Sequence, residues 1–99
     1  DIRALTTDHG VGSYLANCIG GYDGRFGGLN QIDTDTYDII PGTILTLTSD
    51  GVHDVVKAES LKAVVEKAIA AEKNPAHELC AEALRLGSKD NCTAIVVEL

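Results

Sequence analysis

Apolar and polar stretches alternate most clearly in the second half of the chain, where they predict a strand at each end of a helical segment. An apolar run at residues 43–48 is typical of a strand and leads into the turn at residues 49–51, Ser-Asp-Gly. A second such run, residues 92–97, follows directly after the pair Asp-Asn at residues 90–91. Each predicted strand therefore meets a polar turn that carries an aspartate.

Two amphipathic helices are predicted between these strands. From residue 58 to residue 72, apolar side chains recur at the spacing of one helical face: Leu61, Val64, Val65, Ala68 and Ile69. The second helix has Asn74 as its N-cap and Pro75 at its first position, and Gly87 lies where a left-handed residue ends a helix. Its apolar stripe is Ala76, Leu79, Cys80, Ala83 and Leu84. Because the apolar stripes of both helices and the apolar faces of the strands must be buried, we expect a helical hairpin packed on one face of a sheet.

The first half of the chain carries weaker patterns. We expect a short strand at residues 2–6, and residues 29–40 alternate in the manner of a strand with one solvated face. Residues 20–28 contain five glycines, which predicts a tightly turning loop. Pro and Gly at residues 41–42 predict a turn, because proline fixes φ and glycine tolerates positive φ.

The predicted topology brings two acids together. If the strands at residues 43–48 and 92–97 are antiparallel, the end of the first and the start of the second share one rim, so Asp90 returns beside Asp50. Hard cations such as Mg²⁺ and Mn²⁺ prefer carboxylate and water oxygens, and acids at strand ends often hold them. Aspartate also commonly caps turns, and the spacing by itself favours neither interpretation.

Composition narrows the class of partner. A chain of 99 residues forms one small domain, and its apolar fraction of 44% fits a globular protein. The formal net charge is −7, from 15 acids and 8 bases, with no basic stripe, so we expect neither nucleic acid nor anionic membrane as a partner. The same negative field favours a divalent cation.

The cysteine spacing and the lack of targeting segments indicate the cellular compartment. The three cysteines, Cys18, Cys80 and Cys92, include no pair at metal or redox spacing, which favours a reducing, cytoplasmic compartment and thiols that pack as small apolar groups. Neither a run of eighteen apolar residues nor a leader is present. The chain contains no Met, which predicts that Asp1 is not a native start and that the chain is a piece of something longer.

Several segments together resemble one enzyme family. Residues 49–54 (Ser-Asp-Gly-Val-His-Asp), the helical hairpin, and residues 87–97, which begin Gly-Ser-Lys-Asp-Asn-Cys, are similar to the C-terminal half of the PPM-type (PP2C-like) metal-dependent serine/threonine protein phosphatases. Upstream, residues 5–9 (Leu-Thr-Thr-Asp-His) and 14–21 (Tyr-Leu-Ala-Asn-Cys-Ile-Gly-Gly) resemble the threonine-Asp-His and leucine-isoleucine-glycine segments of that family. Residues 41–43 resemble its turn before the Ser-Asp-Gly strand.

The resemblance implies an α+β fold, part of an α-β-β-α sandwich with antiparallel sheets and a two-helix hairpin on one face. It implies a two-metal Mg²⁺ or Mn²⁺ centre in which Asp50 and Asp90 are ligands, with Asn91 orienting the turn. It also implies hydrolysis of phosphoserine and phosphothreonine in a phosphoprotein substrate by in-line attack of a metal-activated water. By this resemblance, residues 1–99 are expected to be the C-terminal portion of a phosphatase domain whose N-terminal half is absent.

The chain also departs from the family. The remaining metal ligands, the Asp-Gly-x-Gly-Gly motif, the phosphate-binding arginine and the histidine proposed as general acid are not found here, so we expect no catalytic residue in this chain and no activity of the chain alone. We expect His53 to have a packing or surface role and His9 to form hydrogen bonds in a turn, while His77 lies on a predicted helix and needs no functional explanation. The missing half must come from elsewhere.

Two functions remain open from the sequence. The first is metal-dependent dephosphorylation of proteins, with the chain as part of a longer PPM-type phosphatase. The alternative is a non-catalytic, self-associating module derived from that fold, because half a sandwich exposes apolar faces and sheet edges that favour association. The corresponding partners are the missing N-terminal half or a second copy of the chain.

Overall fold

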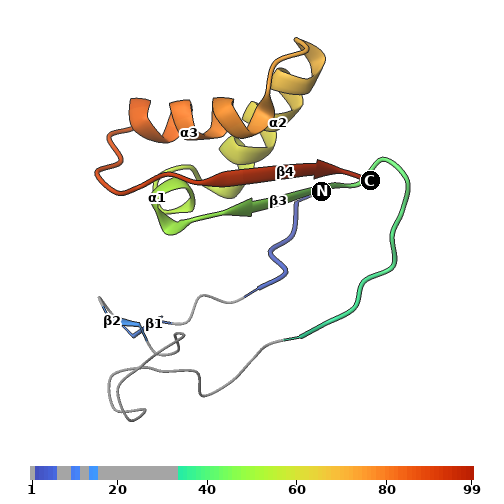
Figure 1. The fold of residues 1–99 in the computed structure, drawn as a ribbon, viewed down its shortest axis with the longest axis horizontal. Coiled ribbons are helices and arrows are strands. Elements are labelled where there is room, and N and C mark those ends of the chain that lie inside the picture. The colour runs from blue at the N-terminus through green and yellow to red at the C-terminus, as the bar shows by residue number, and fades with distance from the viewer. Residues whose placement is uncertain (1, 7–9, 12–13, 16–33) are drawn as a thin grey trace. The chain divides into compact units, whose positions relative to one another are not determined.

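A computed structural model describes residues 2–6, 10–11, 14–15 and 34–99. The chain divides into two compact units, one formed by residues 3–37 and the other by residues 38–99 together with Ile2. All helices among the described residues belong to the second unit (Figure 1).

Residues 38–99 form a small α+β unit of three helices and a two-stranded antiparallel sheet. The predicted order of strand, two helices and strand is confirmed, with one short helix added after the first strand. In chain order the elements are β3 (Ile44–Thr48), α1 (Asp50–His53), α2 (Ala58–Ala70), α3 (Pro75–Arg85) and β4 (Ala94–Glu98). Helices α2 and α3 lie on one side of the sheet (Figure 1), where α3 packs on β4 and α2 packs on α3.

The register of the sheet determines which side chains lie on each of its two faces. Thr46 pairs with Val96 and Thr48 with Ala94, and this face meets the helices, because Ala94 and Val96 pack against the core. Successive side chains of a strand point to opposite faces. The opposite face is therefore aliphatic throughout its centre, formed by the pairs Leu45 with Val97 and Leu47 with Ile95.

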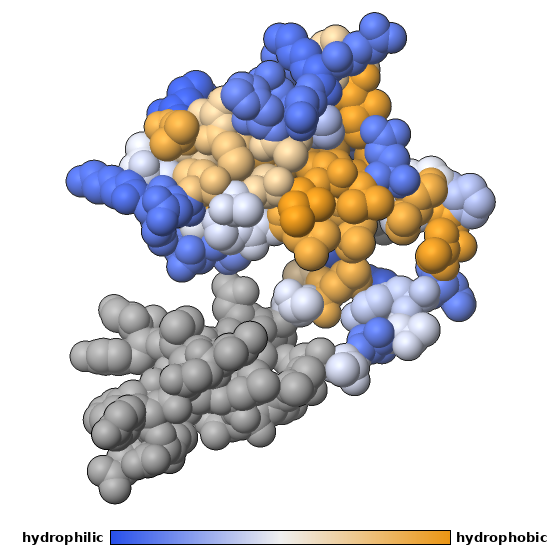
Figure 2. All heavy atoms as spheres, viewed as in Figure 1, coloured by the Kyte–Doolittle hydropathy of each residue, from blue (hydrophilic) through white to orange (hydrophobic). Residues whose placement is uncertain are grey.

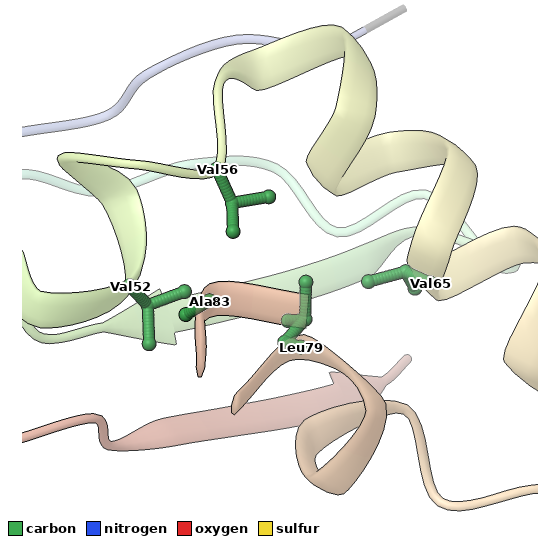
Figure 3. Packing of buried hydrophobic residues seen from close by; sticks show 5 residues of the cluster. All are labelled: Val52, Val56, Val65, Leu79 and Ala83. Carbon is green, nitrogen blue, oxygen red and sulfur yellow. The ribbon is translucent and has the colours of Figure 1, made fainter. Parts of the chain in front are cut away.

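The core lies between the helices and the sheet, and it is aliphatic. Leu79 and Ala83 are fully buried on α3, one helical turn apart. They meet Val65 from α2 and Val52 and Val56, which lie in α1 and just after it (Figure 3). Half-buried side chains pack around this cluster, including both described cysteines. The short segment after Asp50 is thus tied to the hairpin by apolar packing.

Both long helices end in the same motif, although only one carries the expected glycine. At the end of α3, Gly87 has φ 91° and donates its N–H to Leu84 O at 3.0 Å, while Ser88 N–H bonds to Ala83 O at 3.0 Å. At the end of α2, Glu72 has φ 57°, and the N–H groups of Glu72 and Lys73 bond to the carbonyls of Ile69 and Ala68. These are Schellman motifs. Glu72 therefore takes a left-handed conformation that costs a non-glycine residue about 1–2 kcal/mol.

The predicted start of the second helix and the turn before β3 are both confirmed. The side chain of Asn74 accepts the N–H of His77 at 3.2 Å, and Pro75 opens α3. Thr43 N–H bonds to Ile40 O at 3.0 Å across the Pro-Gly pair, where Gly42 has φ 92°. Proline before a glycine of positive φ is the preferred sequence of this turn.

Five expectations about elements are wrong. Residues 2–6 and 34–40 contain no strand, and residues 29–33, like the glycine-rich segment 20–28, lie outside the described part of the chain. Asp50 begins a short helix instead of lying in the predicted turn at residues 49–51. Helix α2 ends at Ala70 because Glu72 is left-handed. Leu84, expected in the buried stripe, is 62% exposed, because it lies about 100° around the helix from Ala83, at the edge of the buried face.

The unit of residues 3–37 is described in part. Strands β1 (Gly10–Val11) and β2 (Tyr14–Leu15) pair antiparallel, with Gly10 opposite Leu15. The Tyr37 hydroxyl donates to Leu5 O at 3.3 Å, and the Arg3 guanidinium lies 5.6 Å from the Tyr37 ring centroid. These contacts join the two described ends of this unit.

Candidate metal centre

Asp50 and Asp90 both lie at junctions between a strand and the helical segment. Asp50 is the first residue of α1, directly after Ser49, which follows β3 and caps α1 in extended conformation. Asp90 lies in the connection from α3 to β4. Both aspartates are exposed, and β3 and β4 are antiparallel. The two connections therefore emerge at the same end of the sheet, as the sequence predicts.

The backbones of the two junctions are in direct contact. A Cβ added to Gly51 would stand 2.1 Å from Asn91 O and 3.3 Å from Asp90 Cβ. Cβ atoms do not approach backbone atoms to 2.1 Å, so only glycine permits this packing. The residue after Asp50 thus lies against the residue after Asp90, and Gly51 itself is buried.

Ser49 connects the two junctions through three hydrogen bonds. Its backbone N–H donates to Thr93 O at 2.9 Å, which extends the strand pairing by one residue pair. Its hydroxyl donates to Asn91 O at 3.2 Å and accepts the N–H of Thr93 at 3.0 Å. Both hydroxyl bonds cross to the segment that carries Asp90.

Ser88 connects them from the opposite direction. Its hydroxyl donates to Gly51 O at 2.7 Å. Cys92 Sγ lies 3.5 Å from the same carbonyl and 3.6 Å from Asp90 O, distances typical of weak thiol contacts. The carbonyl that follows Asp50 thus receives hydrogen bonds from both sides of Asp90.

The donor set suits a hard cation but is incomplete. Asp90 Oδ1 accepts the N–H of Asn91 at 2.7 Å, so the Asp90 carboxylate is held by its own neighbour. Two exposed carboxylates on adjoining backbone provide oxygen ligands of the kind Mg²⁺ and Mn²⁺ take. Within the described residues, no group of three or more His, Cys, Asp or Glu side chains is close enough to hold a metal. Asp50 and Asp90 fit as part of a site that needs ligands from elsewhere.

The histidines have the positions expected of structural residues where they are described. His53, at the end of α1, is half-buried, and its Nδ1 lies 2.9 Å from Thr48 Oγ1, which links α1 back to β3. His77 is exposed on α3 and contributes its backbone N–H to the cap of that helix. His9 lies outside the described residues.

Cys80 and Cys92 are free thiols packed at the edge of the core. Burial raises the pKa of the Cys80 thiol above its ordinary value, and the neighbouring Cys92 adds to the rise. A raised pKa keeps the thiol protonated and unreactive. This agrees with thiols that act as small apolar groups; Cys18 falls outside the described part of the chain.

The hydroxyl groups that organise this site were not identified from the sequence. Ser49 and Ser88 adjoin the aspartates, but serine is common at caps and in loops, and their hydrogen bonds span 44 and 37 positions. The only local signal is a serine directly before a short helix. Hydrogen-bond partners so far apart along the chain can be identified only once the pairing of β3 with β4 is known.

Comparison with protein-family models, with curated proteins and with solved structures finds no match to this chain. Among the described residues, no helix has the length and apolar character needed to cross a membrane.

Proposed function

We propose that this chain is part of a PPM-type metal-dependent serine/threonine protein phosphatase, in which Asp50 and Asp90 hold a divalent metal ion. The fold proposed with it is part of an α-β-β-α sandwich. The observation that carries the proposal is the contact of Gly51 with Asn91, which puts the backbone of the two aspartates side by side at one end of the sheet.

The residues of this chain have a defined task in such an enzyme. When bound, Mg²⁺ or Mn²⁺ supplies charge stabilisation for the phosphoryl group and an activated water. Asp50 and Asp90 would provide two carboxylate ligands from adjoining backbone segments, and Gly51 lacks the side chain that would push those segments apart. The remaining ligands and the groups that bind phosphate are expected in the N-terminal half of the phosphatase domain.

The test is hydrolysis of a phosphoserine peptide and of p-nitrophenyl phosphate by a protein that includes the N-terminal half. We expect Mn²⁺-dependent turnover that Asp50→Asn and Asp90→Asn each reduce by at least about a hundredfold. Asp38→Asn, an exposed aspartate before β3, is the matched control and should retain activity. Undiminished turnover in both site variants would exclude these ligands, and the chain of 99 residues alone should be inactive.

A second candidate function is self-association through the face of the sheet opposite the helices. Leu47 and Ile95 are 49% and 54% exposed at its centre, and apolar atoms gather at the surface of this unit (Figure 2). Exposed aliphatic patches of this kind mark interaction sites. The partner in this case is a second copy of the chain.

Sedimentation velocity at micromolar concentration separates the two candidates. Self-association predicts a dimer that Ile95→Lys converts to monomer, while Leu84→Lys, at a somewhat more exposed position on α3, leaves the dimer intact. A monomer for the unaltered chain argues against self-association and has no bearing on the metal-site proposal.

A further inference from the structure

We propose that Ser49 and Ser88 are positioning residues that hold the backbone of Asp50 and Asp90 at one fixed separation, so that the two carboxylates are preorganised for a single cation. This inference rests on the proposed function, since it concerns the same two ligands. It assigns roles to side chains that would touch neither metal nor substrate.

The contact between Gly51 and Asn91 prevents the junctions from moving closer, but it does not prevent them from moving apart. Metal-site geometry must be held to within about 0.5 Å for productive binding. An attractive connection between the two backbones is therefore required.

The two serine hydroxyls provide that connection from opposite ends. Ser49, directly before Asp50, donates to Asn91 O at 3.2 Å and accepts Thr93 N–H at 3.0 Å. Ser88, two residues before Asp90, donates to Gly51 O at 2.7 Å. Each serine thus reaches across from one aspartate to the backbone that follows the other aspartate, so that separation of the two would break both connections.

The other connections are apolar packing, a weak thiol contact and a backbone hydrogen bond. Val52 is fully buried in the core cluster, against which Cys92 also packs, and this packing holds α1 on the hairpin. Cys92 lies 3.5 Å from Gly51 O, and a thiol is a weak donor. The backbone bond from Ser49 N–H to Thr93 O belongs to the sheet and survives any substitution at Ser49 except proline. Removal of either hydroxyl therefore loosens the junction without removing a strand or a helix.

The test uses the ¹⁵N-labelled chain of 99 residues with Ser49→Ala and Ser88→Ala. Ser49→Thr, which keeps a hydroxyl, is the rescue variant, and Ser60→Ala, an exposed serine on α2, is the matched control. Backbone order parameters are measured without metal. We expect lower values at residues 89–92 in both alanine variants, wild-type values in the rescue and control variants, and unchanged amide shifts in α3.

The second measurement is Mn²⁺ titration, followed by paramagnetic broadening of the Asp50 and Asp90 amide signals. We expect roughly tenfold weaker binding in each alanine variant, a loss of the size seen when groups supporting metal ligands are removed. Should Ser49→Ala unfold the unit, Ser88→Ala, which removes the hydrogen bond to Gly51 O and a weak thiol contact with Cys92, provides the same comparison.

The outcomes distinguish the two proposals. Wild-type order parameters and wild-type Mn²⁺ affinity in both alanine variants would overturn the positioning role and leave the metal site intact. Mn²⁺ that broadens neither aspartate in the unaltered chain would overturn the metal site and the positioning role with it. Lower order at residues 89–92 together with weaker Mn²⁺ binding supports the proposal.

Discussion

Gly51 lies against the backbone carbonyl of Asn91, so closely that a methyl group at Gly51 would stand 2.1 Å from Asn91 O. This contact joins the start of α1 to the connection before β4, two segments forty residues apart. It joins the backbone beside one candidate metal ligand to the backbone beside the other, and its consequences are open to measurement.

Replacement of Gly51 by alanine should destabilise the chain. Alanine has a higher helix propensity than glycine, so the local effect of the substitution on α1 is favourable. The clash of the added methyl group with Asn91 O outweighs this local gain, because the site is then overpacked against backbone. We expect the free energy of unfolding, measured by urea denaturation, to fall by about 2–3 kcal/mol. The amide signals of Asp90 and Asn91 should shift.

Gly42→Ala is the control for this prediction. Gly42 has φ 92° with nothing within 4 Å of the added Cβ, so the substitution adds strain without a clash and should cost about 1 kcal/mol. The Asp90 signal should stay in place. A Gly51→Ala variant as stable as the original chain would show that the two junctions do not touch.

Glu72→Gly should stabilise the chain, although it removes a side chain. Glu72 occupies the left-handed position of the Schellman motif that ends α2, at φ 57°. Glycine adopts this conformation without the steric cost, so the free energy of unfolding should rise by about 0.5–1 kcal/mol. Ala71→Gly, one residue earlier and at negative φ, should lower stability, and a decrease for both variants would contradict the motif.

Two leucines on α3 should differ sharply in their contribution to stability. Leu79 is fully buried against the valines of the core, whereas Leu84 is 62% exposed. Leu79→Ala should cost about 2–4 kcal/mol through lost burial and the cavity left behind. Leu84→Ala should change stability by less than about 0.5 kcal/mol. Equal losses in urea denaturation would mean that α3 is rotated from the orientation described.

The ion pair between Glu82 and Arg85 should be visible in the titration of Glu82. The Arg85 side chain donates two hydrogen bonds to the Glu82 carboxylate and holds the pKa of Glu82 below its ordinary value of 4.5. The pair therefore stabilises the fold above pH 4.5, and this contribution is lost as the pH falls through the lowered pKa.

Arg85→Gln should return the Glu82 pKa towards 4.5, as measured by ¹³C shifts of its carboxyl carbon. Both side chains are at the surface, so the effect on stability should be small and weakened by salt. A Glu82 pKa that Arg85→Gln leaves unchanged would contradict the pair.

The elements with local signals were the ones that could be predicted from the sequence. Asn74 before Pro75 and Gly87 after the apolar stripe mark the ends of α3, because cap chemistry acts over three or four residues. The end of α2 has no such signal, because a glutamate, Glu72, occupies the left-handed position where glycine is usual. The alternation at residues 34–40 resembles a strand, but a strand needs a partner that this segment does not have among the described residues.

The same distinction applies to the candidate site. Asp50 and Asp90 could be selected because each follows or precedes an apolar run, and antiparallel pairing of those runs dictates their shared end. The hydroxyl connections of Ser49 and Ser88, and the need for glycine at position 51, depend on the approach of two distant backbones. No local pattern encodes that approach.

Mapping Mn²⁺ on the ¹⁵N-labelled chain tests the central claim most directly. A shared site predicts broadening that begins together at Asp50 and Asp90 and that either Asp50→Asn or Asp90→Asn weakens at both positions, while Asp38→Asn has no effect on it. Two carboxylates without further ligands should bind weakly, on the order of millimolar. Broadening that is spread evenly over the acidic surface would contradict a common metal site. So would broadening that is confined to one aspartate and does not change when the other aspartate is replaced.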